Sequence, residues 1–193
     1  MSAKGDKTRE LICLESYKLF AEKGFKEVTM KDICEKTGLS RGGLYRHYNN
    51  TEEIFNKIIN RFMQSQENEI LKEIEKGVSA KEILQELLGR YQMEMLDSDN
   101  SLSIAIYEFF SIKQYESSDN ALYEQYLYSK KAWESLIEYG IKTKEFKNVN
   151  VSATFDIIVF SYQGVRLYSK LMPINPRISQ NIIEVIKGIL LDD

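Results

Sequence analysis

The side chains best suited to hydrogen-bonding chemistry gather in one short segment, residues 40–48, which reads SRGGLYRHY. It holds two arginines, two tyrosines and the single histidine of the chain, His47. Arginine can donate two hydrogen bonds to the edge of a guanine, and tyrosine and histidine can donate to phosphate oxygens. Elsewhere we find no nucleophile–base motif, no glycine loop that cradles phosphate, and no cysteine or carboxylate cluster near His47. The sequence therefore favours binding over catalysis, and no catalytic residue, metal site or cofactor is expected.

Two short helices must position this segment. The first is expected to begin after Thr29, whose hydroxyl can cap it with Asp32 three residues later, and to end at Gly38. Ser40 is expected to cap the second. The joining residues, Thr37-Gly38-Leu39-Ser40, include a glycine that permits the positive backbone angle of a tight turn. This spacing predicts a helix-turn-helix, in which the second helix enters the major groove of DNA.

Helical periodicity continues through the rest of the chain. The only prolines are Pro173 and Pro176, so no residue before them forbids a helix interior. The first helix is expected to end at Gly24, and a long fourth helix to begin at Thr51. Beyond Gly77, turn-forming clusters separate five further helices, at roughly 79–97, 101–115, 118–143, 151–171 and 177–191. The prediction is an all-α protein of about nine helices.

The formal charge of −3 is unevenly distributed. Residues 1–62 carry 12 basic and 9 acidic side chains, a net of +3, whereas the remainder carries 14 and 20, a net of −6. An N-terminal part of opposite sign suggests two modules, the first of which faces a polyanion.

Other classes are disfavoured by simple patterns. Residues 1–7 are polar, no apolar segment of a signal peptide follows them, and no run approaches the ~18 apolar residues of a membrane span. A cytoplasmic protein is therefore expected. Cys13 and Cys34 lack CxxC spacing and are interpreted as reduced core residues, with a redox-sensing pair as the alternative.

The stretch from Phe20 to Phe55 reads FAEKGFKEVTMKDICEKTGLSRGGLYRHYNNTEEIF. It resembles the tetracycline-repressor (TetR) family of bacterial transcriptional regulators in its aromatic–Gly–aromatic end to the first helix, its Gly-Leu-Ser turn and its aromatic-rich recognition helix. The resemblance implies a three-helix DNA-binding domain over residues 1–50 and a helical ligand-sensing and dimerisation domain over residues 51–193. It also implies a dimeric repressor, released from a palindromic operator in double-stranded DNA by a small, largely apolar effector.

Two positions depart from the family pattern. Gly43 stands where the family commonly has threonine or serine, and Thr51 stands where it often has a lysine that holds a phosphate. Gly43 leaves no side chain to read a base, although it lets the backbone approach DNA closely. These departures motivate an alternative, an adaptor that keeps the TetR fold but acts through protein–protein contacts.

Position, resemblance and chemistry together imply DNA contacts along both short helices. Arg41 is expected to read a guanine, or alternatively to touch only phosphate. Tyr45 is expected against a thymine methyl or a phosphate, and His47 on a phosphate or, alternatively, neutral and packed. Tyr48 is expected to place its ring in the core and its hydroxyl on a phosphate. The predicted DNA-binding residues are Thr29, Lys31, Ser40, Arg41, Gly42, Gly43, Tyr45, His47, Tyr48 and Thr51.

By the same resemblance, the C-terminal module should hold a ligand. An apolar pocket with scattered phenolic hydroxyls is expected between its helices, with a plain aromatic core as the alternative. Arg166 follows an apolar stretch and is expected to pair with an anionic effector or with a carboxylate across a dimer. The predicted ligand-binding residues are Met63, Tyr91, Met95, Tyr107, Phe110, Tyr126, Trp133, Tyr162 and Arg166.

A homodimer is expected through the last two helices. The expected helix 151–171 is apolar on nearly every side around Phe155 and residues 157–160, and its Gly164 allows another helix to approach closely. The final helix adds Ile182, Ile183 and Ile186 to the expected interface. Two recognition helices would then lie about one DNA turn, roughly 34–36 Å, or somewhat more apart.

Overall fold

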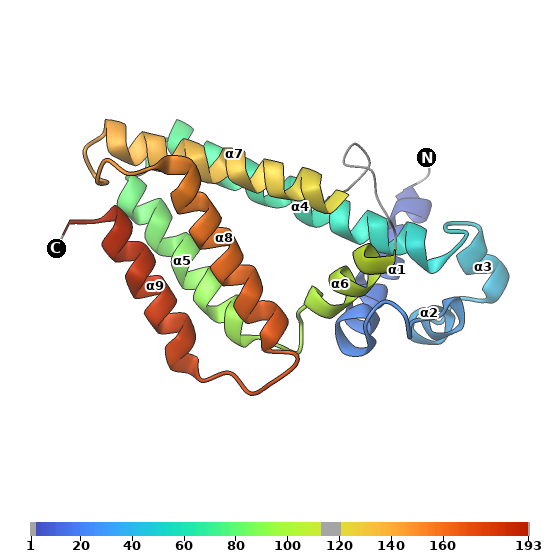
Figure 1. Ribbon diagram of the computed structural model, residues 1–193. Helices are drawn as coiled ribbons and strands as arrows, with labels where there is room; N and C mark the ends of the chain where they lie inside the picture. Colours follow the sequence, from blue (N-terminus) through green and yellow to red (C-terminus); the bar gives the residue numbers. More distant parts are fainter. Residues whose placement is uncertain (1–2, 113–120, 193) are drawn as a thin grey trace. The chain divides into compact units, whose positions relative to one another are not determined.

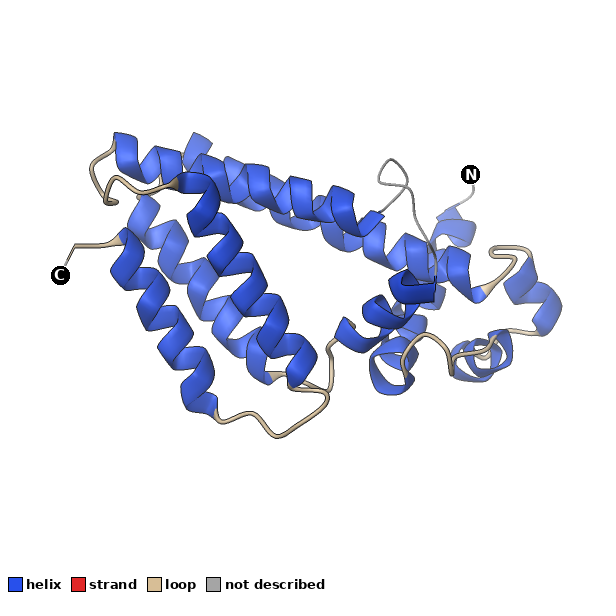
Figure 2. Ribbon diagram, in the orientation of Figure 1, coloured by secondary structure: helices blue, strands red, loops and turns tan. Residues whose placement is uncertain are grey.

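The computed structural model describes the backbone of residues 3–112 and 121–192, and the side chains within these ranges apart from residues 3–4, 62–68 and 112. Throughout the described ranges the chain forms helices and loops without a strand (Figure 2). The predicted all-α fold class is therefore confirmed. The helices of Figure 1 are α1 Ala3–Lys23, α2 Met30–Thr37, α3 Arg41–Tyr45, α4 Thr51–Glu75, α5 Ala80–Leu96, α6 Ser103–Ile112, α7 Ala121–Lys142, α8 Val151–Tyr168 and α9 Pro176–Leu190.

The chain folds into two compact units, and each unit is built from two separate segments of the sequence. The first unit comprises the described residues of 1–62 and 99–122, so α6 belongs to it together with α1, α2, α3 and the start of α4. The second unit comprises residues 63–98 and the described residues from 123 onward. The functional division predicted after residue 50 stays a prediction.

Aromatic packing forms the centre of the first unit. The Phe109 ring of α6 lies 4.7 Å from the Phe25 ring and 5.0 Å from the Phe55 ring, and Phe20 lies 4.9 Å from Phe55. Backbone amides of the α1–α2 loop point at the same helix: Phe25 N donates to Glu108 Oε2 at 2.7 Å and Lys26 N donates to it at 3.0 Å. These contacts attach α6 to the helices of the first unit.

Gly24 makes this attachment sterically permissible. Its φ of +80° lies in the left-handed region, and a Cβ built there would come within 2.6 Å of the Glu108 carboxylate. The predicted glycine end of the first helix is confirmed. The close approach of Glu108 is a second reason why a glycine suits this position.

In the second unit α5, α8 and α9 pack against one another (Figure 1). Their core includes Leu88, Leu136, Phe155 and Leu190, none of which is accessible to solvent. Glu145 closes the N-terminal end of α5, because its carboxylate accepts hydrogen bonds from Ser79 Oγ at 2.5 Å and from Lys81 N at 3.2 Å.

Candidate nucleic-acid interface

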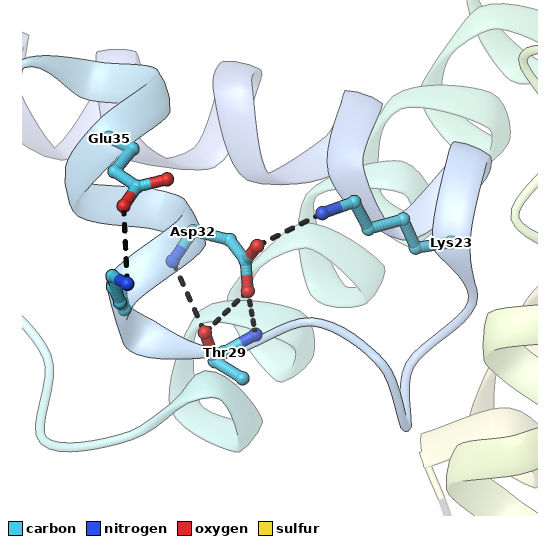
Figure 3. A network of polar contacts seen from close by, with 5 residues as sticks. Lys23, Thr29, Asp32 and Glu35 are labelled. Carbon is cyan, nitrogen blue, oxygen red and sulfur yellow. Dashed lines mark hydrogen bonds and ion pairs between the residues drawn. The ribbon is translucent and has the colours of Figure 1, made fainter.

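Helix α2 begins at a fully formed capping box (Figure 3). Asp32 N donates to Thr29 Oγ1 at 3.2 Å, and Thr29 N donates to Asp32 Oδ2 at 2.9 Å. Lys23 Nζ of α1 lies 2.9 Å from Asp32 Oδ1. The hydrogen bond from the Thr29 hydroxyl, followed by that from Lys23, holds the pKa of Asp32 well below its ordinary value. The cap predicted from the sequence is confirmed, and an ion pair with α1 orients it.

The turn that follows places α3. Gly38 adopts a φ of +71°, and Ser40 Oγ accepts a hydrogen bond from Gly43 N at 3.1 Å. Leu44 is fully buried and anchors the inner side of α3. Because Leu44 points inward, the neighbouring positions of this short helix face outward, which is the arrangement of a helix-turn-helix.

The outward side of this segment carries polar, cationic and aromatic groups. Ser40, Arg41, Gly42 and Tyr45 are exposed, and the Arg41 guanidinium carbon lies 5.5 Å from the centre of the Tyr45 ring. Such a pair presents a fork of donors beside a flat apolar surface. Gly43 and His47 are half-buried and form the edge of this surface.

The predicted contacts at the start of α2 are accessible too. Thr29 is exposed, and the Lys31 side chain is 85% exposed with Glu35 3.7 Å away. Two further exposed cations, Lys36 before the turn and Arg46 after α3, are not among the contact residues predicted from the sequence. Their positive charges next to the predicted turn could have indicated them as candidate phosphate contacts.

Tyr48 has its ring in the core, as expected, but its hydroxyl and Thr51 have neighbours that the sequence did not indicate. The Tyr48 ring is buried, and its hydroxyl lies 3.4 Å from Cys13 Sγ of α1. Burial, followed by this hydrogen bond, raises the Tyr48 pKa. Either atom of this pair can be the donor, so the predicted phosphate contact requires the thiol to donate to the phenol and the phenol to donate to the phosphate. Thr51 is half-buried, and the side chain of Asn50 accepts from Glu53 N at 2.8 Å, so one amide at the start of α4 is already satisfied. Cys13 and Cys34 are free thiols.

The predicted ligand-binding residues are only partly brought together. Trp133 Nε1 donates to the Tyr91 hydroxyl at 3.1 Å, the Tyr91 and Tyr162 rings stack at 4.1 Å, and Met95 is fully buried in the same core. Tyr126 lies at the edge of that core and donates to Asp156 Oδ1 at 2.8 Å.

The other predicted members are placed elsewhere. Tyr107, 61% exposed, and Phe110 lie on α6 in the first unit. The Met63 side chain lies outside the described residues.

Comparisons with known proteins identify the helix-turn-helix segment formed by α2, the turn and α3. The model of "Bacterial regulatory proteins, tetR family" matches residues 14–58, which contain α2, the turn and α3. The chain belongs to the TetR family. The HTH-type transcriptional repressor KstR2 of Rhodococcus jostii (strain RHA1) is 25% identical to it over 157 residues, which cover 80% of this chain and 75% of that protein.

Solved structures of transcriptional regulators share the fold. A TetR-family transcriptional regulator from Cytophaga hutchinsonii superposes with a TM-score of 0.76 at 21% identity, covering all of both chains. A putative transcriptional regulator from Saccharomonospora viridis in complex with choline superposes with a TM-score of 0.79 at 15% identity, covering 97% of this chain and 100% of that one.

Membership of the TetR family makes the chain a DNA-binding transcriptional regulator and not an enzyme. In the parts of the chain that the structure describes, no helix is both long and apolar enough to span a membrane. Among the same residues, no group of three or more histidine, cysteine or acidic side chains is arranged to hold a metal ion.

Proposed function

We propose that this TetR-family regulator is a dimeric repressor that leaves its operator when a small molecule binds the second unit. The exposed face of α3, with Arg41 beside Tyr45 behind a glycine turn, supports this most directly. A helix-turn-helix inserts such a face into the major groove. In this proposal residues 1–50 read DNA, and residues 51–193 sense the ligand and dimerise.

The roles of the contact residues follow from their exposure and chemistry. Arg41 reads a guanine, and Tyr45 lies against a thymine methyl or a phosphate. Thr29 and Lys31 contact the backbone from the start of α2, and His47 donates to a phosphate from the edge. Gly42 and Gly43 allow close approach of the α3 backbone to DNA.

An exposed apolar stripe on α8 supports the proposed dimer. Ile157, Phe160 and Tyr168 follow helical spacing along one face, and Phe160 is 65% exposed. Val185 adds an exposed apolar side chain on α9. Exposed apolar side chains in such a row are typical of an isologous helix–helix interface.

The dimer can be tested by placing a charge in the stripe. Phe160→Asp should shift the protein from dimer to monomer in light scattering, because the carboxylate would be buried without a partner. Met93→Asp is the matched control, since Met93 is 68% exposed on α5. A Phe160→Asp protein that stays dimeric at micromolar concentration would contradict this interface.

Small-molecule control is suggested by one regulator of the same fold, and repression by one relative. The Saccharomonospora viridis regulator was solved with choline, and KstR2 is a named repressor. In this chain the second unit offers an apolar core that also contains phenols, an indole and an arginine. A small, largely apolar effector suits such a lining.

DNA binding can be measured with fragments that flank the protein's own gene. The affinity should fall steeply as salt rises, because phosphate contacts release counterions. Arg41→Ala should weaken specific binding by roughly 10- to 100-fold, which corresponds to about 1–3 kcal/mol. Lys18→Ala is the control, since Lys18 is a cation on α1 that pairs with Glu15. Salt-independent binding, or unchanged binding by Arg41→Ala, would favour the adaptor alternative.

A further inference from the structure

A chain of polar groups connects the half-buried side chains of Glu94 and Arg166 to Tyr162 in the otherwise apolar core of the second unit. Arg166 on α8 donates from Nη1 to the Tyr162 hydroxyl at 2.8 Å, and the Tyr162 hydroxyl donates to Glu94 Oε2 on α5. Tyr162 is buried, and its ring stacks on Tyr91 at 4.1 Å. We call Tyr91, Glu94, Tyr162 and Arg166 the Arg166 cluster.

The cluster contains donors that have no acceptor among the described residues. Arg166 Nε is buried and makes no hydrogen bond there. The Tyr91 hydroxyl accepts from Trp133 Nε1, which leaves its own hydrogen without a described acceptor. Buried donors of this kind cost free energy until an acceptor reaches them. Arg166 Nε and the Tyr91 hydroxyl are therefore the two buried donors of the cluster that still need an acceptor, and the Glu94 carboxylate, which accepts from Tyr162, supplies neither of them with one.

The charges around the cluster also favour an anionic ligand. Arg90, the neighbouring cation, has its charge compensated by Glu69 at 2.8 Å, although its Nε also makes no hydrogen bond among the described residues. Arg166 instead bonds a neutral phenol, and Tyr162 stands between it and the Glu94 carboxylate. The Arg166 guanidinium carbon also lies 5.2 Å from the centre of the Tyr162 ring, so a resident cation already uses that aromatic face. A cationic ligand would have to displace Arg166, whereas an anion would complete its hydrogen bonds.

We propose that the effector is an organic anion with an apolar body, and that the Arg166 cluster binds its acidic head group. Carboxylate oxygens would accept from Arg166 Nε and from the Tyr91 hydroxyl, and the apolar body would contact Trp133 and Met95. This proposal rests on ligand control of the second unit and specifies its chemistry. Arginine suits this task because its planar fork matches a carboxylate.

The single tryptophan of the chain offers a direct readout. Trp133 donates to Tyr91, so a ligand that engages the Tyr91 hydroxyl should change Trp133 emission. Octanoate, octanamide and octylammonium share one apolar body and differ in head-group charge. Octanoate should change the emission and bind at least about tenfold tighter than octanamide, since hydrogen bonds to a charged group are the stronger ones. Octylammonium should bind most weakly.

Variants then assign the head group to the cluster. Arg166→Gln should weaken octanoate binding by about tenfold or more and abolish its advantage over octanamide. Tyr91→Phe keeps the ring and should weaken octanoate binding less, which provides a second test if Arg166→Gln unfolds. Arg177→Gln is the matched control, because Arg177 is an exposed arginine of the same unit. Thermal melts establish that each variant is folded.

The proposal would be overturned if octanamide or octylammonium bound as tightly as octanoate. It would also be overturned if Arg166→Gln and Tyr91→Phe both bound octanoate like the unmodified protein, or if Trp133 emission did not respond to octanoate at millimolar concentration. Operator binding by the ligand-free protein is measured on the same preparations. If operator binding persists while octanoate fails, the assignment of the effector class is wrong but the DNA-binding function stands. If operator binding is absent, the proposed function itself fails.

Discussion

The segment from Thr29 to Glu53, which contains α2 and α3, and the Arg166 cluster are held in place by different kinds of contact. Thr29 and Asp32, Ser40 and Gly43, and Asn50 and Glu53 are each three residues apart in the sequence. In the second unit, by contrast, Tyr91 and Trp133 are 42 residues apart and Glu94 and Tyr162 are 68 apart. The first is thus specified by local turn and cap chemistry, whereas the second exists only after the helices have packed.

The largest expected effect comes from removing a long-range anchor. Trp133→Ala deletes a buried side chain of α7 and leaves a cavity beside Tyr91, at an expected cost of about 3–5 kcal/mol in the free energy of unfolding. Urea denaturation, monitored by circular dichroism, measures this loss of stability. Tyr128→Ala, at an exposed position of the same helix, should stay within about 0.5 kcal/mol. Equal losses in the two variants would contradict the comparison.

A smaller effect is expected from the local contacts. Thr29→Ala removes the capping box of α2 and should cost about 1 kcal/mol in the free energy of unfolding. Thr29→Ser keeps the hydroxyl and should restore most of the stability. If Thr29→Ala cost as much as Trp133→Ala, α2 would depend on its cap far more than a locally specified element should.

The smallest effect concerns Glu145, and its size depends on the pH. Burial opposes ionisation of Glu145, but hydrogen bonds from Ser79, Thr143 and backbone amides outweigh it and lower its pKa from 4.5 to about 2. A carboxylate with a lowered folded-state pKa stabilises the protein fully above pH 4.5 and loses that contribution as the pH falls from 4.5 towards 2.

This pH dependence can be checked with one substitution. Glu145→Gln should flatten the dependence of unfolding free energy on pH within that acidic window, and should lower stability at neutral pH. Chemical denaturation at several pH values measures both changes. An acid dependence identical to that of the unmodified protein would show that Glu145 is not responsible.

The same contrast explains how much could be predicted from the sequence. Helix existence, the Thr29–Asp32 cap, the Ser40 cap and the turn at Gly38 depend on near neighbours, and the structure confirms them. The partner of the Tyr48 hydroxyl could not be predicted, because Cys13 lies 35 residues away on another helix. The position of Glu108 against the α1–α2 loop, at a separation of 83 residues, is a further example.

The candidate ligand residues show the limit most clearly. Residue type alone brought Tyr107 and Phe110 into one predicted pocket with Tyr162; they belong to the first unit and Tyr162 to the second, so a shared pocket stays a prediction. Helical periodicity tells which face of a helix is apolar, but it does not tell which other helix covers that face. For the same reason Arg166 could be singled out from the sequence while its hydrogen bond to Tyr162 could not.

The attachment of α6 also determines how this protein could be divided or recombined. The first unit is discontinuous, since Phe109 and Glu108 come from the middle of the chain and complete a core begun by Phe20, Phe25 and Phe55. A fragment that stopped at residue 62 would expose those three rings and leave the Phe25 and Lys26 amides without their carboxylate. A chimaera that borrows DNA specificity from a relative would therefore have to exchange two separate segments, or keep Gly24 and Glu108 matched across the junction.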